Sequence, residues 1–175
     1  MNPLTELKSS LIREARTAYT ISEKLFRRVT DPELSWKPQS GKNWMTMGQL
    51  LMHCASYGCG KAVQGFVNDR WDIPENNDDA LHIPTVDTLP SVQSVEQALD
   101  LLSTDRHVAL QCLEKVSEND LLTKKVVAPW GGPDLFLYQH LSLMIRHLEQ
   151  HKGQLFYYLK LMGKDVSTKD LWGEE

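Results

Sequence analysis

The chain has 175 residues, 41% of them hydrophobic and 24% charged, which is enough for one domain with a substantial core, expected over residues 1–175. A formal net charge of −4 provides no basic field, so nucleic acid and anionic membranes are not expected partners. No apolar run reaches the ~20 residues of a membrane span, and the charged N-terminal stretch is unlike a signal peptide, so we expect a cytoplasmic protein.

The first predicted helix covers residues 3–29. Its apolar residues recur at steps of three and four, as on a helix with one buried face: Leu4, Leu7, Leu11, Ala15, Ala18, Ile21, Leu25 and Val29. Residues 30–43 contain two prolines and a glycine and are expected to form a turn-rich connection. Trp36 lies within this connection and Trp44 directly after it, and we expect both side chains to cover one end of a helical bundle.

A second helix is predicted over residues 46–67, beginning with a capping box formed by Thr46 and Gln49. His53 lies beside its apolar stripe, where a histidine is either bonded to a backbone carbonyl or available as a metal ligand. Residues 68–92 lack a helical period and are rich in Asp, Asn and Pro. We interpret this stretch as a long crossover, which would allow the second and third helices to run parallel.

The third helix is predicted over residues 94–116, with Ser94 and Gln97 as a further capping box. Asp105 and Arg106 interrupt its apolar side near the middle. A charge at such a position could pair with a carboxylate, hold an anionic substrate, or extend to solvent.

The fourth helix, predicted over residues 134–163 after a turn-rich segment, has the clearest period. Its seam contains Leu137, Leu141, Met144, Leu148, His151, Leu155, Tyr158 and Met162. Asp134 is expected to cap its start, and Gly163 to provide the left-handed residue at its end. Four amphipathic segments without strand alternation predict an all-α fold, a bundle whose apolar seams face one another.

Two histidines, His147 and His151, stand one turn apart in the fourth helix. At this spacing their Cβ atoms are about 5 to 6 Å apart, so both rings could reach one metal ion. The pair is also compatible with one hydrogen-bonded core histidine and one surface histidine. His140 lies about 10.5 Å from His147 along the axis, too far to share that ion, so we expect it to lie either behind the ligands or at the surface. His107 and His82 are expected to be exposed, although His82 could approach a site if the crossover folded as a lid.

Short motifs spread over essentially the whole chain form a set: WKP at 36–38, GKNW at 41–44, MGQL at 47–50 followed by His53, WG at 130–131, HLEQHKGQL at 147–155 and YLKLMG at 158–163. This set resembles the DinB superfamily, the DinB/YfiT-like metalloenzymes, whose members typically carry HxxHHRGQ followed by YLRLLG. Gln150 here replaces the first histidine of the doublet, and Lys152 replaces the arginine. The two histidines that the family uses as ligands are present as His147 and His151.

The resemblance implies a four-helix bundle with up-down-down-up topology, often assembled as a homodimer. It also implies a divalent metal ion, with zinc or nickel expected first, bound by His53 from the second helix and by His147 and His151 from the fourth. Three histidines leave at least one coordination position open for water or substrate, which is typical of catalytic sites. The ligand types do not exclude iron or manganese.

Two hypotheses for function follow from this resemblance. The first is a metal-dependent enzyme, a thiol-dependent transferase or hydrolase-like protein, acting on a small-molecule substrate with a low-molecular-weight thiol, as some relatives do. An open metal position could make a bound thiol or water nucleophilic at neutral pH. The alternative is a non-catalytic binding or regulatory bundle with an inherited or purely structural metal site. No motif fixes a general base, and the candidates are Glu149 and Asp105.

Overall fold

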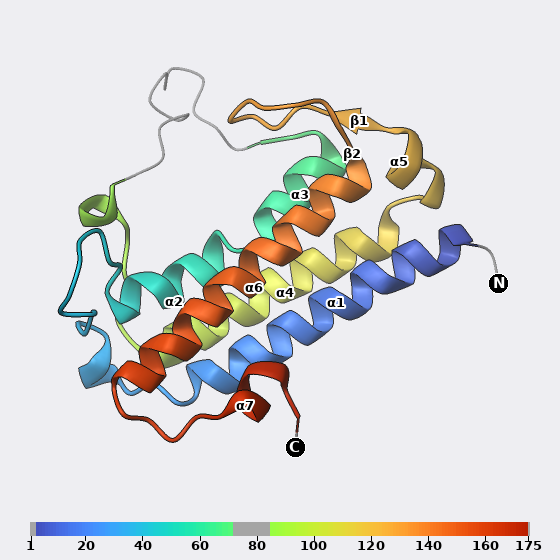
Figure 1. Cartoon of the computed structure of the whole chain (residues 1–175). Coiled ribbons are helices and arrows are strands. Elements are labelled where there is room, and N and C mark those ends of the chain that lie inside the picture. Colours follow the sequence, from blue (N-terminus) through green and yellow to red (C-terminus); the bar gives the residue numbers. More distant parts are fainter. Residues whose placement is uncertain (1–2, 72–84, 175) are drawn as a thin grey trace.

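The computed structural model describes residues 3–71 and 85–174, and Figure 1 shows that they are predominantly helical. The elements, in chain order, are α1 (Pro3–Phe26), η1 (Asp31–Glu33), α2 (Met47–Ser56), α3 (Gly60–Asn68), η3 (Val86–Thr88), α4 (Val95–Lys115), α5 (Glu118–Thr123), β1 (Lys125–Val126), β2 (Leu135–Phe136), α6 (Leu137–Leu161) and α7 (Thr168–Trp172). The predicted helical fold class is confirmed. Within the described ranges, no helix is both long and apolar enough to cross a membrane.

The core lies among α1, α4, α6 and the pair formed by α2 and α3. α1 packs against α4 and α6, and the α2 and α3 pair packs against the same two helices. In Figure 1 α2 and α3 follow one another along the length of α6. The buried residues of α1 recur at the predicted spacing: Leu11, Ala15, Ala18, Ile21 and Leu25. This packing places the last turn of α2 beside the middle of α6.

The second predicted helix is in fact two helices, α2 and α3, separated by residues 57–59. The backbone amides of Gly60 and Lys61 donate to the carboxylate of Asp105 in α4, at 2.8 and 3.2 Å. In a continuous helix these amides would bond back to carbonyls of α2, so the carboxylate allows a new helix to start. Asp105 is buried, which excludes the possibility that its charge extends to solvent.

The segment between α4 and α6 is more regular than predicted. It contains α5 and β1, and β1 pairs antiparallel with β2 in the register Lys125↔Phe136 and Val126↔Leu135. Because β2 precedes the last helix, α6 begins at Leu137 and not at residue 134. Asp134 therefore does not cap α6, and that prediction is wrong; the N-cap residue is Phe136.

Other helix-end signals agree with the sequence to different degrees. The capping box at residues 46–49 is fully formed. Ser94 accepts from the backbone N–H of Gln97 at 3.0 Å, but the side-chain oxygen of Gln97 accepts from Gln93, so the second box is only half formed. Gly163 ends α6 with a φ of +75°, the left-handed conformation predicted for it.

The two tryptophans predicted to cover one end of the helices do so by contacting Tyr158 of α6. The rings of Trp36 and Trp44 meet the Tyr158 ring edge to face, with centroids 5.3 and 6.1 Å away. The Tyr158 hydroxyl donates to the carbonyl of Met45 at 3.0 Å, next to the start of α2. This contact ties α6 to the segment that leads into α2.

The predicted crossover, residues 68–92, is described only in part, and His82 lies outside the described residues. Its described C-terminal part contains η3, which is attached to α2. The side-chain amide of Gln49 donates to the carbonyls of Val86 and Leu89, at 2.9 and 3.0 Å.

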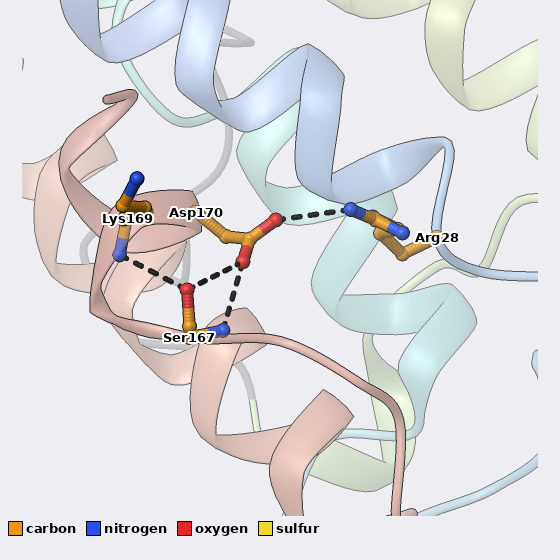
Figure 2. Close-up of polar contacts among 4 residues, drawn as sticks. All are labelled: Arg28, Ser167, Lys169 and Asp170. Atoms are coloured by element: carbon orange, nitrogen blue, oxygen red, sulfur yellow. Dashed lines mark hydrogen bonds and ion pairs between the residues drawn. The ribbon is translucent and has the colours of Figure 1, made fainter. Parts of the chain in front are cut away.

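The C-terminal segment forms a short helix, α7, that packs against α1 and α6. Figure 2 shows the contacts at its start: the carboxylate of Asp170 accepts from the backbone N–H of Ser167 at 2.8 Å and pairs with Arg28 at 3.1 Å. The Ser167 hydroxyl in turn accepts from the backbone N–H of Lys169 at 3.2 Å. The capping box and the ion pair with Arg28, which follows α1, thus hold this segment in place.

Candidate metal centre

Three half-buried histidines meet between α2 and α6. His53 lies in the last turn of α2, and His147 and His151 lie one turn apart in the middle of α6. Their Nε2 atoms converge: that of His147 is 3.3 Å from His53 and 3.1 Å from His151. The ligand atoms of all three lie within 4.8 Å of one another. The structure thus brings together the three residues that the sequence predicted as ligands.

The hydrogen bond on the far side of the His147 ring fixes which nitrogen carries the proton. Its Nδ1 lies 2.9 Å from the backbone carbonyl oxygen of Gly58, in the break between α2 and α3. A carbonyl oxygen can only accept, so Nδ1 of His147 carries the hydrogen and donates it. In the neutral ring, Nε2 is then the atom with the free lone pair.

A longer chain of hydrogen bonds fixes the His151 ring in the same way. The Tyr158 hydroxyl donates to the Met45 carbonyl, so its oxygen accepts from the side-chain amide N–H of Gln154, at 3.2 Å. The amide oxygen of Gln154 therefore faces His151 and accepts from its Nδ1 at 3.0 Å. Nε2 of His151 is left unprotonated and points at Nε2 of His147.

Two lone pairs facing each other across 3.1 Å repel unless a cation lies near them. Metal–nitrogen bonds of about 2.0 to 2.1 Å place neighbouring imidazole nitrogens roughly 3.0 to 3.4 Å apart. The separations of the His147 nitrogen from those of His53 and His151, 3.3 and 3.1 Å, match this range. Imidazole nitrogens also suit a divalent transition metal. The residues present therefore fit a metal ion on three separate grounds, namely donor type, tautomer and spacing.

Burial keeps His53 and His151 in the neutral form that binds metal. Desolvation, with the charges of His151 and His147 adding to it, lowers the pKa of His53 to about 4. Burial likewise lowers the pKa of His151, although its bond to Gln154 opposes this. Both imidazoles are thus neutral at pH 7 and available as ligands.

Residues 14–155 match the DinB superfamily. The chain belongs to the DinB superfamily. Two solved structures share its fold. A DinB-like protein from Bacillus cereus ATCC 10987 has 15% identity and a TM-score of 0.68, with 91% of this chain and 95% of that chain covered. A candidate member of the DinB family from Exiguobacterium sibiricum 255-15 has 19% identity and a TM-score of 0.64, with 92% and 95% covered. No curated protein sequence matches the chain.

The positions at which the chain departs from the DinB motif lie outside the group formed by His53, His147 and His151. Gln150 is exposed on α6, whereas Lys152 is buried, and burial lowers the pKa of its ammonium group. Within the described part of the chain, neither residue is hydrogen-bonded to the three histidines. The histidine doublet of the family motif is therefore a single histidine in this chain, and the three converging nitrogens are still present.

The other two histidines in the described part of the chain, His107 and His140, lie apart from this group. His140 is buried, stacks on Phe66 with ring centroids 4.2 Å apart, and its Nε2 lies 2.8 Å from the Val126 carbonyl oxygen. It therefore fastens the β1 strand to α6 and does not lie at the surface. His107 is exposed, as predicted, and is 2.8 Å from the Gln111 side chain.

The two candidate general bases do not join the ligand group, which contains only the three histidines among the described residues. Glu149 is half-buried on α6, and Asp105 is occupied by hydrogen bonds elsewhere. The sequence pattern alone did not identify Gln154 and Gly58 as hydrogen-bond partners of His151 and His147. Gln154 could have been found from its position three residues after His151, on the same helix face.

Gln154→Leu should weaken zinc or nickel binding about 10- to 100-fold, because it removes the acceptor that holds Nδ1 of His151. Affinity is measured by competition with a chelator of known strength. Gln150→Leu, one turn away on the exposed side, is the matched control and should bind like the wild type. Equal affinities for wild type and Gln154→Leu would show that this bond does not orient the ligand.

The metal-free protein should lose stability as the pH falls from about 6.5 to about 4. Since the folded pKa of His53, about 4, lies below the unfolded value near 6.5, the unfolded chain binds more protons in that window. Above about pH 6.5, His53 is neutral in both the folded and the unfolded chain, so this pH dependence of stability disappears. Urea midpoints measured across the range should fall more steeply for the wild type than for His53→Gln. Parallel curves would contradict the lowered pKa.

Proposed function

We propose that this DinB protein is a metal-dependent enzyme with zinc or nickel bound by His53, His147 and His151. The observation that supports this most is the pair of unprotonated Nε2 atoms of His147 and His151, which face each other at 3.1 Å. The hydrogen bond that Nδ1 of each ring donates keeps these Nε2 atoms unprotonated and fixes the orientation of each ring. Such preorganisation is typical of a binding site for a cation.

We infer a thiol-dependent transferase or hydrolase-like reaction on a small-molecule substrate. A divalent ion with an open position would lower the pKa of a bound thiol or water and present it as a nucleophile. Hydrogen bonds from Nδ1 hold His147 and His151 in one tautomer, and burial lowers the pKa of His53 and of His151. The low-molecular-weight thiol is the expectation that follows from the family.

The residues next to His53 fit a substrate with an apolar body and a negative group. The half-exposed Tyr57 ring stacks near His53, with centroids 6.2 Å apart. The Lys61 ammonium lies 5.6 Å from the centre of the Tyr57 ring. Together they give the edge of the site an aromatic surface and a positive charge, which suits a thiolate or carboxylate.

The test uses protein loaded with cobalt(II) and a panel of cysteine, glutathione and coenzyme A. At pH 7, below the free thiol pKa of about 8.5, at least one thiol should produce a thiolate-to-cobalt absorption band in the wild type. His147→Gln should show none. Transfer of that thiol to a chlorinated aromatic electrophile should then depend on the metal. Metal-loaded protein that gives neither a band nor transfer would favour the non-catalytic alternative.

We further propose that the helices form the up-down-down-up four-helix bundle, with α2 and α3 together as the second member, and that the chain is a cytoplasmic homodimer. The contacts of α1 and of the α2 and α3 pair with both α4 and α6 support the bundle. Exposed apolar residues on α6 support pairing with a second copy: Leu143, Tyr157 and Leu161. Sedimentation should give twice the chain mass, and Leu161→Glu should give the mass of one chain.

A further inference from the structure

A buried carboxylate in α4, outside the metal centre, has no role in the chemistry proposed so far. Asp105 is 5% exposed and accepts three hydrogen bonds. The Tyr19 hydroxyl of α1 donates at 2.7 Å, and the backbone amides of Gly60 and Lys61 donate at 2.8 and 3.2 Å. Three helices therefore meet at one side chain.

Asp105 acts as the cap of α3 although it belongs to another helix. Cys59, which occupies the N-cap position of α3, makes no side-chain capping bond. The Asp105 carboxylate takes its place, since it accepts from the first amides of α3 and its charge complements the positive helix start. Gly60 allows this approach, because a Cβ there would lie 2.6 Å from Oδ1 of Asp105.

The same break carries the carbonyl that orients a metal ligand. Gly58, two residues before the start of α3, accepts from Nδ1 of His147 at 2.9 Å. The Gly58 backbone packs closely against the end of α2, because a Cβ at Gly58 would lie 2.5 Å from the carbonyl oxygen of Cys54. The end of α2 and the start of α3 thus both bear on where the Gly58 carbonyl points.

We propose that Asp105 is a positioning residue for the metal centre: by holding the start of α3, it keeps the Gly58 carbonyl aimed at His147 and so keeps Nε2 of His147 directed at the ion. Tyr19 assists by donating to the carboxylate, and burial raises its pKa so that the hydroxyl stays protonated. The inference rests on the metal site proposed above. It assigns no contact between Asp105 and metal or substrate.

The test compares Asp105→Asn with Asp100→Asn, an exposed aspartate on the same helix. Asparagine at position 105 keeps the size but places an amide N–H where only acceptors fit. Its affinity for cobalt(II), measured by chelator competition, should fall about 10- to 100-fold, as for other groups that orient ligands. The visible spectrum of bound cobalt should also change, because the His147 ring is released. Asp100→Asn should match the wild type in both.

A second comparison separates positioning from general loss of stability. Leu25→Ala removes a buried side chain of α1 and should lower the melting temperature while leaving cobalt affinity and spectrum unchanged. Tyr19→Phe removes one bond to Asp105, keeps the ring, and should cause a smaller loss of affinity; it carries the test if Asp105→Asn does not fold.

The outcomes separate this inference from the proposed function. Wild-type affinity and spectrum in the folded Asp105→Asn protein, or in Tyr19→Phe if that variant carries the test, would overturn the positioning role while leaving the metal site intact. An equal loss of cobalt affinity in Leu25→Ala would show that lower stability alone weakens metal binding, which would also overturn the positioning role. A wild-type protein that binds no cobalt would overturn both the inference and the metal site on which it rests.

Discussion

Replacing His147 with glutamine should lower the affinity for zinc or nickel about 10²- to 10³-fold. Structural zinc sites with four ligands bind with roughly 10–16 kcal/mol, so one ligand contributes about 2.5 to 4 kcal/mol. His147 is the central member of the histidine group, since its Nε2 is the atom near both other rings, at 3.3 and 3.1 Å. Metal content after purification without a histidine tag and chelator competition both measure the loss.

The matched control for this change is His107→Gln, which alters an exposed histidine on α4. It should retain the metal content and affinity of the wild type, because His107 is not part of the converging group. If His147→Gln and His107→Gln bound metal equally well, the ion would have to be held elsewhere.

The second large effect is expected at Gly60, where alanine should lower the free energy of unfolding by about 2 to 3 kcal/mol. A Cβ at this position would lie 2.6 Å from Oδ1 and 2.7 Å from Cγ of Asp105, and it would also meet the Asp105 carbonyl oxygen. These atoms belong to a buried residue in a packed helix, so they have little room to move. Urea unfolding of the metal-free protein measures the change.

Gly153→Ala provides the opposite case for the same substitution. Among the described residues, and apart from the neighbouring backbone of α6 itself, no atom lies within 4 Å of the position that a Cβ would take at Gly153, in the middle of α6. Alanine there should stabilise the protein by about 0.5 to 1 kcal/mol, because glycine is the poorer helix former. A Gly60→Ala protein as stable as Gly153→Ala would show that the α3 start tolerates a side chain and that the carboxylate is less tightly held.

Helical periodicity was sufficient to predict the long helices and to place the histidines. The seam of the last helix continues through His151, and the motif around His151 indicated the DinB superfamily. The family match over residues 14–155 confirms this prediction. The convergence of His53 with the α6 pair came from the family resemblance, since nothing in the spacing of the sequence links a residue in α2 to α6.

The break between α2 and α3 escaped prediction because its cause is distant in sequence. The apolar pattern continues across the break, and the only local signs are the glycines at 58 and 60. The side chain that stabilises the new helix start, Asp105, lies 45 residues after Gly60. A tertiary contact thus decides what the local pattern leaves open.

The sequence also did not predict the short strands or the hydrogen bonds that extend from His151 to Met45, because these too depend on contacts or lengths that leave no local pattern. Two-residue strands are too short to show alternation, so β1 and β2 have no pattern of their own. The chain of bonds from His151 through Gln154 and Tyr158 follows one face of α6 but ends at Met45, in a separate segment. Position along a helix identifies the first of these partners, whereas the last requires the packed structure.

If the proposed metal centre is right, three imidazoles from α2 and α6 hold one divalent ion. Anomalous diffraction from crystals soaked in zinc or nickel, with data on both sides of the absorption edge, tests it most directly. We predict a single strong peak within about 2.0 to 2.1 Å of Nε2 in His53, His147 and His151, with at least one coordination position free of protein atoms. Soaked crystals without a peak there, or with a peak that leaves out one of these rings, would show that the three histidines do not form a metal site.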